Sequence, residues 1–176
     1  MSDELATLAR TIIDANLYLT VGTADRDGRP WVTPVYYATA DYTDFYWVSA
    51  ADAEHSRNIA ERPDVSIVIF DSGARPYEGR AVYLTAVAAE LTGGELARCL
   101  GFYPGPAERG ATSIALEDVT PPSPYRLYRA TATEHYVLCP RPPREPCALH
   151  GIAVDHRARI TAPVSGPSAP TTRPAA

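Results

Sequence analysis

The feature that most constrains the fold is a series of short β-branched and aromatic segments separated by turn residues. Runs of this composition, bounded by turn residues, are typical of β-strands. The Asp27-Gly28 pair between the first two segments is a strong hairpin signal. The first three segments therefore predict an antiparallel meander. The six predicted strands are 17–24, 31–40, 44–50, 64–71, 80–91 and 124–138.

Short helical patterns lie beside these strands. Residues 3–15 carry leucine and isoleucine at helical spacing, which predicts an amphipathic helix. Residues 52–62 predict a second helix that Pro63 ends, with Asp52 as its N-cap or first-turn acid. Residues 93–104 predict a third helix. Six strands with short helices indicate a mainly β, barrel-like α+β domain.

The composition changes near residue 140. Residues 1–140 predict one folded domain, because a chain of 176 residues fits a single core. Residues 141–160 form a proline-dense extension, in which we expect one further short strand or a segment docked on the surface. Residues 161–176 contain almost no large apolar side chain, so we predict a disordered tail.

The charged residues exclude several classes of function. All 16 basic residues are arginine, so neither a Schiff-base lysine nor the lysine of a phosphate-binding P-loop is present. The net charge of −5, without a basic stripe, argues against nucleic acid as a partner. The sequence shows neither a secretory signal nor an apolar run of about 18 residues. We therefore expect a cytoplasmic protein with no membrane span.

Cysteine and histidine spacing predicts no metal site. The three cysteines are odd in number and contain no CxxC pair, which favours reduced thiols. His150 and His156 lack a third ligand at a recognised spacing. A haem would need an axial ligand, for which His135 is a further candidate, although a lone histidine is more often structural. The cysteines are Cys99, Cys139 and Cys147.

A polar passage before the fourth predicted strand has the composition of an anion site. The stretch AEHSRNIAERPDVSIVIF places His55, Arg57 and Asn58 on the second predicted helix. The first-turn N–H groups of a helix favour a bound phosphate, and donor side chains there add charge-assisted hydrogen bonds. Ser49 ends the preceding strand and is expected to line the same corner.

Structural roles explain the same residues equally simply. Arg57 would then be a solvated arginine paired with Glu54 or Glu61, His55 a surface histidine, and Asn58 a turn cap. Both interpretations stay open on the residues alone.

The order and spacing of three passages resemble the pyridoxamine 5′-phosphate oxidase-like superfamily, the flavin-binding split β-barrels. The resemblance covers about residues 5–138, and its most specific parts are GRPWVTPV, FYWVS and HSRNIAERPDVS. It implies a six-stranded antiparallel split β-barrel with short flanking helices. It also implies a homodimer, with FMN in a groove between the two protomers.

The resemblance also implies two sets of cofactor contacts. The second strand would run beside the isoalloxazine ring, through Val32, Thr33, Pro34 and Val35. The end of the third strand and the helix that follows would hold the ribityl phosphate, through Val48, Ser49, His55, Arg57 and Asn58. A protonated His55 would add charge, so FMN affinity is expected to rise as the pH falls from about 8 to 6.

Departures from the family pattern narrow the expected function. Glu54-His55 stands where the family oxidases carry an Arg-Lys pair, and their R-x-H substrate element is not found near the C-terminus. We therefore expect an FMN-dependent oxidoreductase acting on a small organic substrate, not a true pyridoxamine phosphate oxidase. The alternatives are a deazaflavin (coenzyme F-420)-dependent reductase, which the arginine- and alanine-rich composition keeps open, and a non-catalytic flavin- or haem-binding protein. No residue is predicted to be catalytic.

Overall fold

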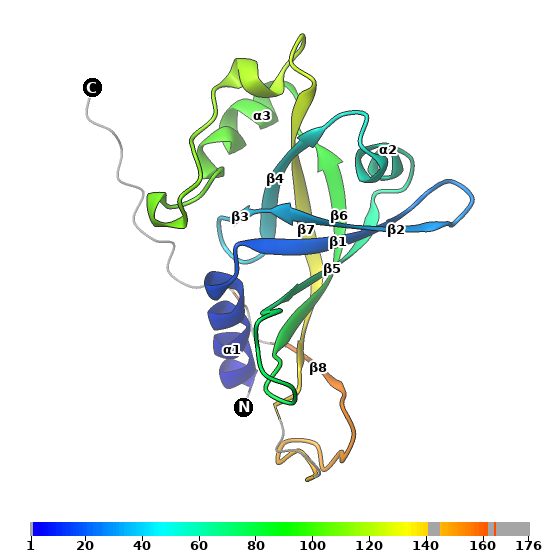
Figure 1. Ribbon diagram of the computed structural model, residues 1–176, viewed down its shortest axis with the longest axis vertical. Coiled ribbons are helices and arrows are strands. Elements are labelled where there is room, and N and C mark those ends of the chain that lie inside the picture. The colour runs from blue at the N-terminus through cyan, green and yellow to red at the C-terminus, as the bar shows by residue number, and fades with distance from the viewer. Residues whose placement is uncertain (1, 141–144, 162–163, 165–176) are drawn as a thin grey trace.

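The computed structural model describes residues 2–140, 145–161 and 164. One antiparallel sheet curves into a half-barrel with three α-helices around it (Figure 1). The helices are α1 (Ser2–Ala15), α2 (Glu54–Glu61) and α3 (Gly93–Cys99). The strands are β1 (Tyr18–Ala24), β2 (Pro30–Tyr36), β3 (Ala38–Thr39), β4 (Asp44–Ala50), β5 (Asp64–Phe70), β6 (Ala81–Glu90), β7 (Tyr125–Leu138) and β8 (Arg157–Arg159).

The strand order is β2-β1-β5-β6-β7-β4-β3, and β8 pairs with β7. The predicted mainly β fold with six long antiparallel strands and short helices is confirmed, and β3 and β8 are brief additions. The extension therefore contains the further strand that was expected there. Short 3-10 turns at Leu100–Phe102, Ala107–Arg109 and Leu116–Val119 lie in the connection between β6 and β7.

The predicted three-strand meander is wrong in one respect. β1 and β2 form the expected hairpin, but β4 pairs with β7 and with the short β3. The predicted strand is interrupted at Tyr37, between β2 and β3. Tyr37 is fully buried, and its hydroxyl donates a hydrogen bond to the Ile13 carbonyl at 2.6 Å. Burial of this one ring turns the chain away from β2, so β4 joins the other end of the sheet.

The main core lies between α1 and the concave sheet. β5 shows why, because Val65, Ile67 and Ile69 are buried while Ser66 between them is exposed. The burial of alternate side chains is what the period of a strand predicts. α1 adds an apolar stripe of Leu5, Ala6, Ala9, Ile12 and Ile13 to this core.

A second, smaller core lies on the other side of β4. Phe45 and Trp47 point into the main core, whereas Tyr46 between them packs with the second core. The second core is completed by α3 and the residues around it, namely Leu91, Leu96, Cys99, Val119 and Leu127. β4 is therefore fixed on both faces, which gives its carboxyl end a defined position.

The C-terminal extension returns to the barrel. Ile160 and Val164 are buried, and the Val164 carbonyl accepts a hydrogen bond from Arg10 Nη1 at 3.2 Å. The described residues thus reach into the segment predicted as a tail. The rest of that prediction, residues 162–163 and 165–176, lies outside the described residues, as do residues 141–144.

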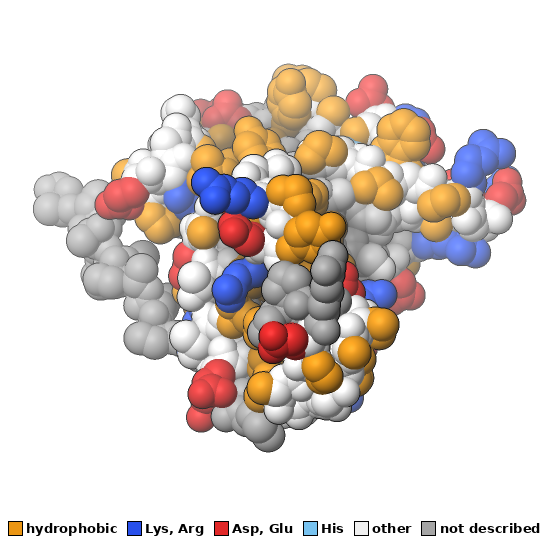
Figure 2. Space-filling model, turned by 60° about the horizontal axis from the view of Figure 1, so that its bottom comes forward, with side chains coloured by type: hydrophobic (Ala, Val, Ile, Leu, Met, Phe, Trp, Pro, Cys, Tyr) orange, Lys and Arg blue, Asp and Glu red, His pale blue; other side chains and the backbone are white. Residues whose placement is uncertain are grey.

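Two surface properties bear on possible partners. Among the described residues, no helix is long and apolar enough to cross a membrane. Figure 2 turns the lower end of the molecule forward and shows arginine and acidic side chains mixed with hydrophobic ones on that face.

Candidate functional site

The carboxyl end of β4 and the first turn of α2 form a polar corner, which we call the α2 corner. It comprises Ser49, His55, Arg57 and Asn58. The helix begins at Glu54 with Ala53 as its N-cap, so the prediction of Asp52 as N-cap is wrong. Ala53 offers no side-chain hydrogen bond to the first turn. The first N–H groups of α2 are therefore free of a side-chain cap.

His55 is buried at this corner. Its Nε2 lies 2.8 Å from Ser49 Oγ, and the two residues are 6% and 9% exposed. The alternative of a surface histidine is therefore wrong. Burial lowers the pKa of His55 below its usual value of 6.5. The positive charge expected to strengthen phosphate binding between about pH 8 and 6 consequently develops only at more acidic pH.

Arg57 lies at the exposed rim of the corner. Its guanidinium donates to the Glu54 carboxylate and to the Asp52 carbonyl. The ion pair with Glu54 that was considered from the sequence is confirmed. Because the Arg57 side chain is 56% exposed, this pair contributes little to stability and keeps a cation beside the helix start.

Asn58 is directed away from the helix start. It is 3% exposed and donates from Nδ2 to Thr23 Oγ1 on β1 at 3.1 Å. Thr23 in turn donates to the Trp31 carbonyl on β2 at 3.4 Å. This chain of contacts connects α2 to the strand that carries the other half of the predicted site. In the free protein Asn58 therefore positions α2.

The predicted ring-binding residues alternate along β2. Val32 and Pro34 face solvent, Thr33 is half-buried, and Val35 is a core residue. Val48, the remaining predicted residue, is half-buried against the second core. Val35 and Val48 have side chains occupied by packing, so the backbone is the part of each that a ligand would contact.

One residue at the corner was missed by the sequence analysis. Arg126 on β7 is directly opposite Ser49 on β4, and its Nε is 3.4 Å from Glu90 Oε1. It adds a second fixed cation, with 17% of its side chain exposed. The alternation in PYRLYR was the available signal, because it places Arg126 and Tyr128 on one face of β7.

Trp47 lies beneath the corner. It is fully buried two positions before Ser49 and stacks on Tyr128, with ring centroids 5.7 Å apart. Its Nε1 has no hydrogen-bond partner in the described part of the chain. Buried indole N–H groups usually find a partner, so this atom marks a polar position beneath the corner.

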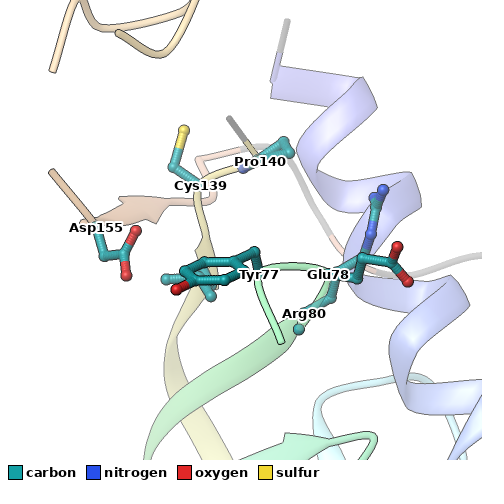
Figure 3. Close-up of a pocket in the computed structure, with 8 residues that line it drawn as sticks. Tyr77, Glu78, Arg80, Cys139, Pro140 and Asp155 are labelled. Atoms are coloured by element: carbon teal, nitrogen blue, oxygen red, sulfur yellow. The ribbon is translucent and has the colours of Figure 1, made fainter. Parts of the chain in front are cut away.

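A clear pocket lies elsewhere in the molecule. It has a volume of about 680 Å³ and lies between the β5–β6 loop and the end of β7 (Figure 3). Tyr77, Arg80, Cys139 and Asp155 are among its lining residues. α2 precedes β5 and this loop follows it, so the pocket and the α2 corner lie at opposite ends of that strand. The predicted site residues do not line this pocket.

Comparisons with known proteins agree with this fold. A family model described as pyridoxamine 5′-phosphate oxidase matches residues 5–139. No curated protein matches the sequence significantly. Among solved structures, a heme binding protein from Mycobacterium smegmatis has 22% identity and a TM-score of 0.61 over 88% of this chain and 57% of its own.

Two further structures show the same fold at lower identity. A putative 5-nitroimidazole antibiotic resistance protein from Bacteroides thetaiotaomicron has 13% identity and a TM-score of 0.59, over 74% of this chain and 81% of its own. The heme storage protein HutZ from Vibrio cholerae has 17% identity and a TM-score of 0.52, over 73% and 89%. At these identities the likeness is one of fold.

Proposed function

Because the chain belongs to the pyridoxamine 5′-phosphate oxidase family, we propose that it binds FMN and acts as an FMN-dependent oxidoreductase on a small organic substrate. The observation that carries the proposal is the uncapped start of α2 with Ser49, His55 and Arg57 around it. A helix N-terminus beside neutral and charged donors suits a phosphate group. Bound FMN would supply the hydride chemistry, and the residues of the chain would bind and orient it.

Three residues of the corner and the adjacent Arg126 have distinct parts in holding the phosphate. Ser49 and His55 offer hydrogen bonds from a buried, pre-positioned pair. Arg57 exchanges its exposed Glu54 partner for the phosphate at little cost, because exposed ion pairs are weak. Arg126 adds positive charge on the adjacent strand.

The outer edge of β2 suits the flavin ring. β2 hydrogen-bonds to β1 alone among the described strands, so its other backbone edge stays available. Val32, Thr33, Pro34 and Val35 follow one another along this edge. We assign them the ring contacts, with Val35 acting through its backbone.

A homodimer would complete this groove. Tyr18 on β1 and Val32 on β2 are 60% and 61% exposed on the outer face of the hairpin, and Pro34 is exposed beside them. Large exposed apolar side chains on one face favour an interface, and a two-fold dimer uses the same face twice. Light scattering should give the mass of a dimer, and a monomeric mass at micromolar concentration would contradict the shared site.

Haem is the second candidate ligand. Two of the similar structures are named for haem binding or storage, at 22% and 17% identity. Against haem, the four histidines of the chain all have hydrogen-bond partners within the described residues. These contacts give the histidines structural partners, and His55 is the only one of the four at the α2 corner.

Ligand titration separates these possibilities. The purified protein is mixed in turn with FMN, riboflavin, coenzyme F-420 and haem, and the retained absorbance is recorded after gel filtration. We expect retention of FMN with a weaker hold on riboflavin, and a loss of FMN affinity in Ser49→Ala. Ser66→Ala, at an exposed serine on β5, is the matched control. Retention of haem alone, or of no ligand, would overturn the proposal.

Turnover is tested separately from binding. The FMN-loaded protein is mixed anaerobically with NADH or NADPH, and bleaching of the flavin absorbance is followed. Bleaching that is reversed by an added electron acceptor supports an oxidoreductase. A flavin that binds but is reduced no faster than free FMN would point to a non-catalytic binding protein.

A further inference from the structure

The C-terminal extension gathers four metal-binding side chains at the end of β7. β8 pairs with Tyr136–Leu138, and this pairing brings the extension back beside the last residue of the strand. The four side chains are Cys139, Cys147, His150 and His156. The sequence analysis discounted metal because the two histidines lacked further ligands, and the fold supplies them as two cysteines.

The ligand atoms of this Cys/His cluster lie close together. The Sγ atoms of Cys139 and Cys147 are 3.3 Å apart. His150 Nδ1 lies 3.4 Å from the first sulfur and 3.3 Å from the second. His156 Nε2 lies 3.1 Å from His150 Nδ1. All four ligand atoms lie within 4.8 Å of one another.

These separations are close to the edges of a zinc tetrahedron. With Zn–S bonds of about 2.3 Å and Zn–N bonds of about 2.0 Å, ligand atoms at tetrahedral corners are roughly 3.3–3.8 Å apart. Four of the six separations are 3.1–3.4 Å, at or just below the short end of that range, and the other two are no longer than 4.8 Å. Small movements of the side chains therefore suffice to surround one ion.

Backbone contacts already orient the ligands. His156 Nδ1 lies 2.9 Å from the Val154 carbonyl, which directs Nε2 to the cluster. The His150 backbone N–H donates to Cys147 Sγ at 3.1 Å. The Cys139 N–H donates to the His156 carbonyl at 2.9 Å, which connects the two ends of the cluster. Such outer contacts are typical of metal sites because they fix ring tautomers and stabilise thiolates.

The cluster is closed on the protein side. Cys139 and Cys147 are 4% and 1% exposed, while His150 and His156 lie nearer the surface. Cys139 also forms part of the wall of the pocket in Figure 3, where its sulfur points away from the Tyr77 ring. The pocket and the cluster thus lie on different sides of this residue.

We propose that Cys139, Cys147, His150 and His156 bind one structural Zn²⁺ ion that fastens the C-terminal extension to the end of β7. Two thiolates and two imidazoles form a ligand set that zinc uses in structural sites, where four protein ligands leave no open position. The site is distant from the α2 corner and does not depend on the proposed cofactor.

Metal analysis of the untagged full chain tests the proposal. The protein is purified with reductant and supplied with Zn²⁺, and unbound metal is removed by gel filtration. The zinc content is then measured by elemental mass spectrometry. We expect about one zinc per chain in the wild type and a nearly complete loss in Cys139→Ser and Cys147→Ser. Cys99→Ser is the matched control, since Cys99 is also a buried free cysteine but lies in the second core.

A second measurement remains informative if the variants fold poorly. The wild-type protein is treated with a thiol-alkylating reagent with and without added Zn²⁺, and the modified cysteines are identified by peptide mass. Zinc should protect Cys139 and Cys147 and leave the labelling of Cys99 unchanged. The proposal is overturned if zinc protects neither thiol, if the reduced protein binds no zinc, or if a disulfide joins the pair despite the reductant.

Discussion

The α2 corner and the Cys/His cluster both gather polar side chains at an end of the barrel, but they satisfy them in different ways. At the corner, His55 pairs with Ser49, Asn58 with Thr23 and Arg57 with Glu54. At the cluster, four ligand atoms lie within 4.8 Å of one another. The first arrangement suits a ligand that enters from solvent and replaces the exposed Glu54 partner of Arg57. The second suits an ion enclosed by the protein.

The two regions also differ in what holds them to the barrel. Ile59 anchors α2 in the main core and is 3% exposed. The extension is held by the short β8, by Ala158 and Ile160, and by the half-buried Leu149. The extension therefore makes the larger apolar contact with the main core and adds a cluster of metal-binding atoms, whereas α2 is held by Ile59 and by the buried hydrogen bond from Asn58 to Thr23.

The largest expected effect tests the apolar anchor of α2. Ile59→Ala should lower the free energy of unfolding by about 2–5 kcal/mol, because it leaves a cavity in the main core. Ile152→Ala in the extension is the matched control, since Ile152 is 39% exposed and should change stability by less than about 1 kcal/mol. Urea unfolding measures both. Equal effects would show that the burial of Ile59 does not anchor α2.

The sequence was most informative about the strands. Runs of β-branched and aromatic residues bounded by turn residues predicted all six long strands. The partners of those strands were harder to predict. The burial of Tyr37 separates β2 from β3, and β4 pairs with β7. No local sequence pattern predicts a tertiary contact of that kind.

The two sites show the same limit. The residues of the α2 corner lie close together in the sequence, so a motif and a resemblance were enough to point to them. The Cys/His cluster is spread from Cys139 to His156, and only the pairing of β8 with β7 brings it together. Spacing rules detect metal ligands that lie in one local motif. They do not detect ligands that come together only when a later strand pairs with an earlier one.

Cofactor affinity at the α2 corner gives the next largest effect. Arg57→Ala should lower the affinity for FMN by roughly 10-fold. This is the low end for loss of a charge-assisted hydrogen bond, because the guanidinium is exposed. Riboflavin, which lacks the phosphate, should bind equally to both proteins. Arg62→Ala, at an exposed arginine just after α2, is the control. Equal losses of affinity for FMN and riboflavin would show that Arg57 supports the fold and does not contact the phosphate.

Truncation compares the attachment of the extension with the residues beyond it. Removing residues 165–176 should leave the melting temperature unchanged, because their composition offers little apolar surface. Removing residues 161–176 also deletes Val164, which is 5% exposed and bonded to Arg10. We expect a loss of about 1 kcal/mol, or roughly 2–4 °C in the melting temperature. Identical melting of the two truncated proteins would show that Val164 contributes nothing.

The smallest expected effect concerns protonation of His55. Burial lowers the pKa of this residue in the folded protein below its unfolded value of 6.5, so the folded state binds fewer protons than the unfolded one. The contribution of His55 to stability is therefore complete above that unfolded value and is lost as the pH falls through the lower folded pKa. We expect the urea midpoint of the wild type to decrease between about pH 7.5 and 5.5.

A variant isolates this single imidazole from other titrating groups. His55→Gln keeps a side chain able to bond Ser49 but does not titrate, so its urea midpoint should decrease less than that of the wild type over the same range. His135→Gln, which removes a histidine bonded to the Tyr42 carbonyl, should keep the full decrease. Comparing these two variants distinguishes protonation of His55 from acid destabilisation through other groups. If His55→Gln and the wild type lose stability in parallel, the neutral His55–Ser49 pair is not what acid disrupts.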